Sequence, residues 1–214
     1  DHFVTADGRA RQVAFPIVKK QGRWRVFVLG ESSAHASYYP IEDGFPALLE
    51  HGLRARNPGQ EVEVLLESLE DDDGIVVLSK KKADFLRHLV ATLGLSGVDV
   101  RTGRAERLAH QSELRESFDL VVTRALARLN VLAEYTLPFC TVGGVMVALK
   151  HGGIDDELTG AAQALKALGG QLAAVQPVEV TGLTDNRIVV AVDKIISTPD
   201  RFPRRTGIPA KRPL

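Results

Sequence analysis

The sequence predicts an α/β fold packed with a β-rich segment at its N-terminal end. From about residue 80 onward, short apolar runs typical of strands alternate with segments whose apolar residues recur at helical spacing. Such alternation favours a sheet with helical crossovers. Before that point the segments are short, apolar and β-like. We therefore predict two parts, residues 1–82 and 83–214, which pack together because no Pro- or Ser-rich linker separates them.

The N-terminal part is predicted to consist mainly of short strands. Residues 13–18 and 23–29 are β-prone runs separated by a glycine-containing turn. Leucines at helical spacing predict a short helix over residues 44–56, which an Asn-Pro-Gly sequence ends. Residues 61–65 alternate polar and apolar side chains, and an acidic turn separates them from the apolar residues 75–78. This pattern predicts a β-hairpin.

The C-terminal part begins with a predicted amphipathic helix over residues 80–93, whose apolar side chains share one face. The elements that follow are separated by glycines or polar turns. We predict helices over residues 129–137 and 155–168, and strands over residues 98–101, 118–123, 145–150, 171–180 and 187–192. The runs at 118–123 and 145–150 are mostly apolar, as expected for central strands of a sheet.

The composition is that of a globular chain and excludes several classes of protein. Of the 214 residues, 44% are hydrophobic and 25% charged, and 27 Lys and Arg balance 27 Asp and Glu, so net charge indicates no partner. The single cysteine, Cys140, follows an apolar run and is expected to be buried, so neither a disulfide nor a metal site is predicted. No apolar stretch reaches the roughly 20 residues that span a bilayer. The first residues lack a signal-peptide pattern, and we expect a cytoplasmic location without membrane contact.

Several short motifs of the C-terminal part occur in a characteristic order and spacing. They are Gly103-Arg104-Ala105-Glu106, Thr123-Arg124-Ala125-Leu126-Ala127, Ala148-Leu149-Lys150 and the closing stretch over residues 202–214. Through them, residues 83–214 resemble the bacterial small-subunit rRNA guanine-N7 methyltransferases, also called glucose-inhibited division protein B. The resemblance implies a Rossmann-like methyltransferase sheet, S-adenosylmethionine as cofactor and small-subunit rRNA as partner.

The same resemblance implies the residues of the site. Ala105 and Glu106 would lie beside the adenine of the cofactor, and Arg124 would be the catalytic residue that positions the guanine and the methyl donor. Glu67 would end the second strand, where a carboxylate can accept hydrogen bonds from ribose hydroxyls. Ligands of open α/β sheets bind outside the carboxyl ends of strands, where these residues are expected. Taken without the resemblance, Glu106 also suits a surface cap, and Arg124 an ordinary surface cation.

The family's glycine-rich cofactor loop, of the type Gly-x-Gly-x-Gly-Phe-Pro-Gly, is represented here by Gly44-Phe45-Pro46 alone. Gly44 and Phe45 are the predicted cofactor contacts that remain, and the first strand and its glycine loop are expected to be degenerate or missing. Three interpretations stay open. The chain is an active methyltransferase, a non-catalytic RNA-binding protein that keeps the fold, or a recombined or artificial chimera of two RNA-related domains.

The N-terminal part carries a second resemblance, strongest over residues 59–83 and weaker over residues 13–30. Over about residues 8–83 it resembles the OB-fold RNA-binding repeats of the largest small-subunit ribosomal protein. An OB surface binds single strands by stacking bases on exposed aromatic side chains and tracking phosphates with cations. Trp24, Tyr38 and Tyr39 are therefore predicted RNA-binding residues.

Two architectures are compatible with these resemblances. In one, an OB-like module is fused to a methyltransferase domain that lacks its first strand and its cofactor loop. In the other, residues 26–29 and 61–66 are the first and second strands of one degenerate methyltransferase domain. The first strand is central in this fold, and its loss would leave the strand at residues 118–122 with an unpaired edge. In either case the N-terminal part is expected to cover that edge.

The last residues of the chain are rich in arginine and lysine among prolines, which keep such a segment extended. Arginine suits phosphate because its planar guanidinium donates two parallel hydrogen bonds. We predict contacts with the rRNA backbone for Arg204, Arg205, Lys211 and Arg212. The alternative is a solvated tail that wraps the domain.

Overall fold

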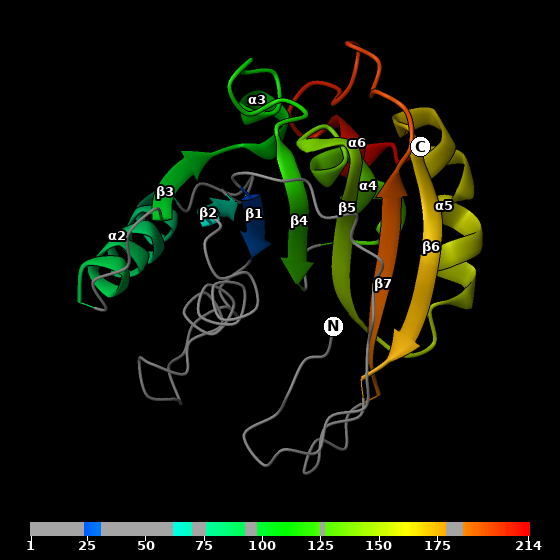
Figure 1. Ribbon diagram of the computed structural model, residues 1–214, viewed down its shortest axis with the longest axis horizontal. Helices are drawn as coiled ribbons and strands as arrows, with labels where there is room; N and C mark the ends of the chain where they lie inside the picture. The colour runs from blue at the N-terminus through cyan, green and yellow to red at the C-terminus, as the bar shows by residue number, and fades with distance from the viewer. Residues whose placement is uncertain (1–23, 31–61, 70–75, 93–97, 125–126, 179–185) are drawn as a thin grey trace.

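The computed structural model describes residues 24–30, 62–69, 76–92, 98–124, 127–178 and 186–214, which build one seven-stranded sheet flanked by helices (Figure 1). The strands are β1 (Trp24–Gly30), β2 (Val62–Leu69), β3 (Val98–Gly103), β4 (Phe118–Arg124), β5 (Cys140–His151), β6 (Gly170–Pro177) and β7 (Arg187–Lys194). The helices are α2 (Val76–Thr92), α3 (Ala105–Leu108), α4 (Leu129–Thr136), α5 (Asp155–Leu168) and α6 (Ile208–Lys211).

The strand order is β3-β2-β1-β4-β5-β7-β6. The first five strands of this order pair in parallel, whereas β7 is antiparallel to both β5 and β6. Parallel neighbours need crossover connections, and α2 and α4 supply them between β2 and β3 and between β4 and β5. The predicted α/β alternation of the C-terminal part is confirmed.

Each face of the sheet is covered by its own core. The larger core joins the sheet to α3, α4 and α5, and it includes Val121 of β4 and Met146 of β5. The smaller core lies under α2 and includes Ala83, Leu120 and Val122. Successive strand side chains point to opposite faces, so the apolar run of β4 serves both cores at once. This explains why its sequence shows no polar alternation.

The two described strands of the N-terminal part belong to the same sheet. Val26 of β1 lies opposite Val64 of β2 on one side and Leu120 of β4 on the other. The first strand is therefore present at the centre of the sheet, and the expectation that it is missing is wrong. This is the arrangement of the second predicted architecture, in which residues 26–29 and 61–66 supply the first and second strands of one sheet.

The predicted hairpin between residues 61–65 and 75–78 is also wrong. Residues 76–78 open α2, and β2 pairs in parallel with β1 and β3 on its two sides, which leaves no place for an antiparallel hairpin partner. Likewise, no OB-like arrangement is found for β1 and β2, which pair in parallel. Residues 1–23, 31–61 and 70–75, which hold the predicted elements at 13–18 and 44–56, lie outside the described residues. The division of the chain at residues 82 and 83 stays a prediction.

Cys140 is fully buried at the start of β5, as expected, and burial raises the pKa of its thiol to about 12. Within the described residues, no helix has the length and apolar character needed to cross a membrane.

Gly169 ends α5 and touches the segment that follows β7. Its φ of 81° lies in the left-handed region, and its amide bonds back to the last turn of the helix. The amides of Ile195 and Ile196 donate hydrogen bonds to its carbonyl, at 2.9 and 3.2 Å. A Cβ atom at this position would lie 1.9 Å from the Ile196 carbonyl oxygen. The close approach therefore requires glycine.

We expect Gly169→Ala to lower the free energy of unfolding by more than about 2 kcal/mol, since left-handed strain of roughly 1–3 kcal/mol adds to the backbone clash. Gly160→Ala is the matched control, because Gly160 lies inside α5 with nothing within 4 Å of a new Cβ. That change should stabilise the helix by up to about 1 kcal/mol. Urea denaturation measures both, and equal effects would contradict the described turn.

Candidate functional site

Four parallel strands end at the same edge of the sheet. Gly30, the last residue of β1, lies between Ser68 of β2 and Arg124 of β4. On the outer side, Leu69 at the end of β2 lies opposite Gly103 at the end of β3. Open α/β sheets bind ligands outside the carboxyl ends of their strands. This edge is the candidate functional site.

Two polar side chains mark this edge at the end of β4. Arg124 is half-buried and forms no ion pair with any described residue. Thr123 is 1% exposed, and its hydroxyl makes no hydrogen bond within the described part of the chain. A buried polar group without a partner is destabilising. Thr123 thus places a buried hydroxyl without a described partner next to Arg124, the last residue of β4.

The predicted adenine contacts follow β3 directly. Ala105 and Glu106 are the first two residues of α3, and both are buried. The amides of Arg107 and Leu108 donate to the Arg104 carbonyl. The amides of Ala105 and Glu106 have no intrahelical acceptor, so these two groups suit a ligand. The Glu106 carboxylate, however, accepts a hydrogen bond of 2.9 Å from the Gly207 amide. Its side chain is therefore a structural anchor, which leaves the backbone for ligand contacts.

The remaining predicted site residues divide into three groups. Glu67 lies at the same edge, opposite Leu29 of β1 and Arg101 of β3. Trp24 opens β1 and so lies at the opposite end of the strand from Gly30. Gly44, Phe45, Tyr38 and Tyr39 lie outside the described residues. Within the described ranges, His, Cys, Asp and Glu side chains form no group of three that could hold a metal ion.

The C-terminal tail, residues 195–214, is anchored to the domain by a buried lysine. The Lys194 ammonium donates to the carbonyls of Leu137 and Leu168, at 2.8 and 3.2 Å, and pairs with Glu116 at 3.1 Å. These carbonyls lie at the ends of α4 and α5, where helices leave acceptors unpaired. Burial lowers the pKa of Lys194, although Glu116 acts in the opposite direction. Lys194 also donates to the Thr198 hydroxyl, which fixes the start of the tail.

Further contacts hold the tail against the segment between α3 and β4. The Arg115 guanidinium donates to the carbonyls of Thr198, Pro199 and Phe202, at 2.8, 3.3 and 2.9 Å. The His110 Nε2 donates to the Pro203 carbonyl at 2.9 Å. These contacts fix the backbone of the tail before its arginines are considered.

The predicted RNA-binding cations of the tail differ in the structure, because one is ion-paired within the chain and the other three are exposed. Arg204 binds the fully buried Glu134 through Nε and Nη2, at 2.9 and 2.6 Å. This hydrogen-bonded carboxylate raises the pKa of Arg204. Its guanidinium is thus committed to an ion pair within the chain. Arg205, Lys211 and Arg212 are exposed, and their RNA contacts stay predictions.

A family model described as rRNA small subunit methyltransferase G matches residues 64–185. The match begins inside β2, ahead of the predicted boundary at residue 83. The chain is 43% identical over 171 residues to the ribosomal RNA small subunit methyltransferase G of Dehalococcoides mccartyi, covering 80% of this chain and 72% of that protein. It is 43% identical over 167 residues to the protein of that name from Moorella thermoacetica, covering 78% and 69%.

Among solved structures, the fold resembles a geranyl diphosphate methyltransferase in complex with GPP and sinefungin. The TM-score is 0.51, with 12% identity, over 84% of this chain and 75% of that one. At this identity the likeness concerns the fold alone, and it agrees with the predicted Rossmann-like methyltransferase sheet. No comparison supports an OB-fold repeat, a chimera or a non-catalytic protein.

Glu106→Ala is expected to lower the free energy of unfolding by about 1–3 kcal/mol, because the buried Gly207 amide loses its acceptor. Glu106→Gln retains an oxygen acceptor and should cost less than half as much. Chemical denaturation distinguishes the two variants. Equal and negligible losses would mean that this hydrogen bond does not anchor the tail.

The Glu116 carboxylate makes stability depend on pH. Burial alone would raise its pKa, but the Thr198 amide and Lys194 outweigh burial and hold the pKa of Glu116 below its ordinary value of 4.5. As the pH falls, the unfolded chain therefore takes up a proton on Glu116 before the folded chain does. The stabilisation is complete above pH 4.5 and is lost as the pH falls through the lower folded-state value.

Glu116→Gln should therefore reduce stability near neutral pH by about 1–3 kcal/mol and flatten its decline in acid. Urea denaturation over an acidic pH series measures both effects. A variant whose acid profile parallels that of the wild type would show that Glu116 carries no such linkage.

Proposed function

Because the chain belongs to the rRNA small subunit methyltransferase G family, we propose that it transfers a methyl group from S-adenosylmethionine to guanine N7 of small-subunit rRNA. The observation that carries this proposal is the convergence of four parallel strand ends on Gly30, Leu69, Gly103 and Arg124. A cytoplasmic location, where rRNA is made and modified in bacteria, is part of the same proposal.

The groups at this edge fit the cofactor. Gly30 ends the central strand without a side chain, so a ligand can approach the backbone closely. The amides of Ala105 and Glu106 at the start of α3 can donate to a heterocycle such as adenine. Glu67 is the proposed acceptor for ribose hydroxyls, because it lies near the end of β2. The unpaired Thr123 hydroxyl supplies a further polar contact. When bound, S-adenosylmethionine supplies a methyl group already activated by its sulfonium.

The chain needs to position the methyl donor and the guanine, and it needs to provide little acid–base chemistry. Guanine N7 carries an exposed lone pair and no proton, so methyl transfer there requires no general base. The bound cofactor would supply the methyl group and keep the electron pair of the broken C–S bond on sulfur, so no residue of the chain has to accept a proton or a leaving group. The Arg124 guanidinium can donate to guanine O6 while N7 stays free for the methyl group. Holding donor and acceptor in line is then the main catalytic contribution.

We expect Arg124→Ala to lower methyl transfer to small-subunit rRNA by about 100-fold, because misplacement of reacting groups has effects of that order. Transfer from radiolabelled S-adenosylmethionine measures the rate, and calorimetry measures cofactor affinity separately. Lys166→Ala, an exposed cation of α5, is the charge-matched control. A wild-type chain that neither binds the cofactor nor methylates rRNA would overturn the proposed function.

A further inference from the structure

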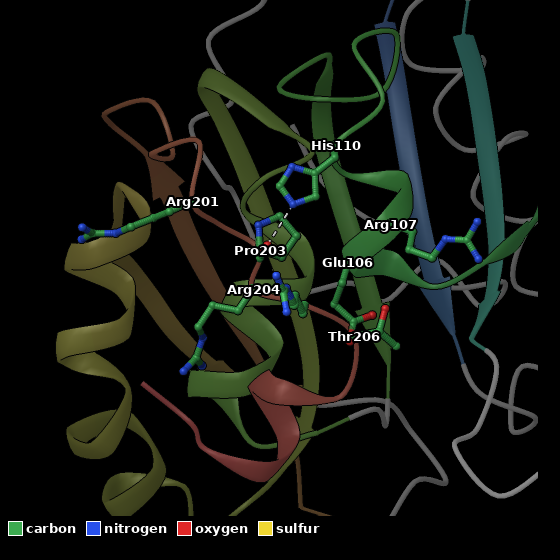
Figure 2. Close-up of a pocket in the computed structure, with 8 residues that line it drawn as sticks. Glu106, Arg107, His110, Arg201, Pro203, Arg204 and Thr206 are labelled. Carbon is green, nitrogen blue, oxygen red and sulfur yellow. Dashed lines mark hydrogen bonds between the residues drawn. The ribbon is translucent and has the colours of Figure 1, made fainter.

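A pocket of about 630 Å³ lies between α3 and the C-terminal tail (Figure 2). It is separate from the strand ends described above, although Glu106 of α3 forms part of its wall. Its lining residues come from two segments about 90 residues apart in the chain. They are Glu106, Arg107 and His110 from α3 and its end, and Arg201, Pro203, Arg204, Arg205 and Thr206 from the tail.

Positive charge dominates this pocket. Half of its eight lining residues are arginines, and its one acid, Glu106, is buried and bonded to the Gly207 amide. Arg204 is neutralised by Glu134. The other three, Arg107, Arg201 and Arg205, are exposed and form no ion pair with a described residue. Since the whole chain carries equal numbers of cations and anions, this is a local concentration of charge.

The backbone that carries these arginines is already fixed. Figure 2 shows His110 and Pro203 joined by a hydrogen bond, with Arg107 and Arg201 extending to opposite sides of it. The Arg201 guanidinium lies 5.1 Å from the centre of the Phe202 ring. Thr206 precedes Gly207, whose amide is held by Glu106. A ligand would therefore meet a backbone that is already fixed, and only the exposed guanidinium groups would have to be ordered on binding.

From this arrangement we propose that the pocket between α3 and the tail binds phosphates of the RNA backbone through Arg107, Arg201 and Arg205. The proposal rests on the proposed function, because RNA is the partner that this function implies. Guanidinium groups match phosphate geometry through paired hydrogen bonds.

The proposed phosphate site has a second property. Glu106 belongs both to its wall and to the first turn of α3, so a phosphate bound here holds the helix that borders the candidate cofactor edge.

The test compares Arg107→Ala, Arg201→Ala and Arg205→Ala with Lys166→Ala, which removes an exposed charge outside the pocket. The probe is a radiolabelled transcript of small-subunit rRNA, bound on filters over a range of salt concentrations. Each arginine variant should bind roughly three- to tenfold more weakly. Its plot of log affinity against log salt should also be flatter, by about 0.7–0.9 for each phosphate that the variant no longer neutralises. Lys166→Ala should behave like the wild type.

Calorimetry with S-adenosylmethionine on the same variants separates the two proposals. If the wild type binds the cofactor and methylates rRNA, but the arginine variants bind RNA as tightly as the wild type does, the pocket assignment is overturned. The proposed function stands in that case. Equal weakening by Lys166→Ala would also overturn it, because the effect would then be one of overall charge. Loss of affinity for inorganic phosphate without loss of RNA binding would assign the pocket to a free anion instead.

Discussion

The parallel pairing of β1 with β2 and β4 is the constraint on which the rest of the structure depends. A central strand satisfies the backbone groups of both neighbours, and without β1 the sheet would present two unpaired edges in its interior. The same pairing decides where the strands end. By setting Gly30 beside Arg124 and Ser68, it creates the edge at which a ligand can meet groups from four strands.

The tail depends on a second kind of interaction, in which buried charged side chains are hydrogen-bonded to groups in or beside it. Lys194, Glu134 and Glu106 are each almost fully buried, and each is satisfied by a partner in or beside the tail. A buried charge that loses its partner destabilises a protein strongly. The tail is thus part of the domain, and through Glu106 its position is tied to the turn that follows β3.

The sequence predicted the parts of this structure that depend on local pattern. The apolar runs of β4 and β5, the helix α5 with its terminal glycine, and the position of Arg124 at a strand end were all visible in it. Residues 76–78 were misassigned, because a short apolar run suits a strand or a helix equally. The partners of Glu106 and Arg204 were not visible, since they lie 101 and 70 residues away and only the fold brings them together.

The late position of the anchoring residues has a consequence for biosynthesis. Synthesis proceeds from the N-terminus at about 5–20 residues per second, and a nascent domain begins to organise as it emerges. Glu106 and Glu134 emerge well before Gly207 and Arg204, so their carboxylates have no native partner during that interval. They must remain hydrated until the tail follows. The faces of α3 and α4 that carry them are therefore completed only after the tail has been synthesised.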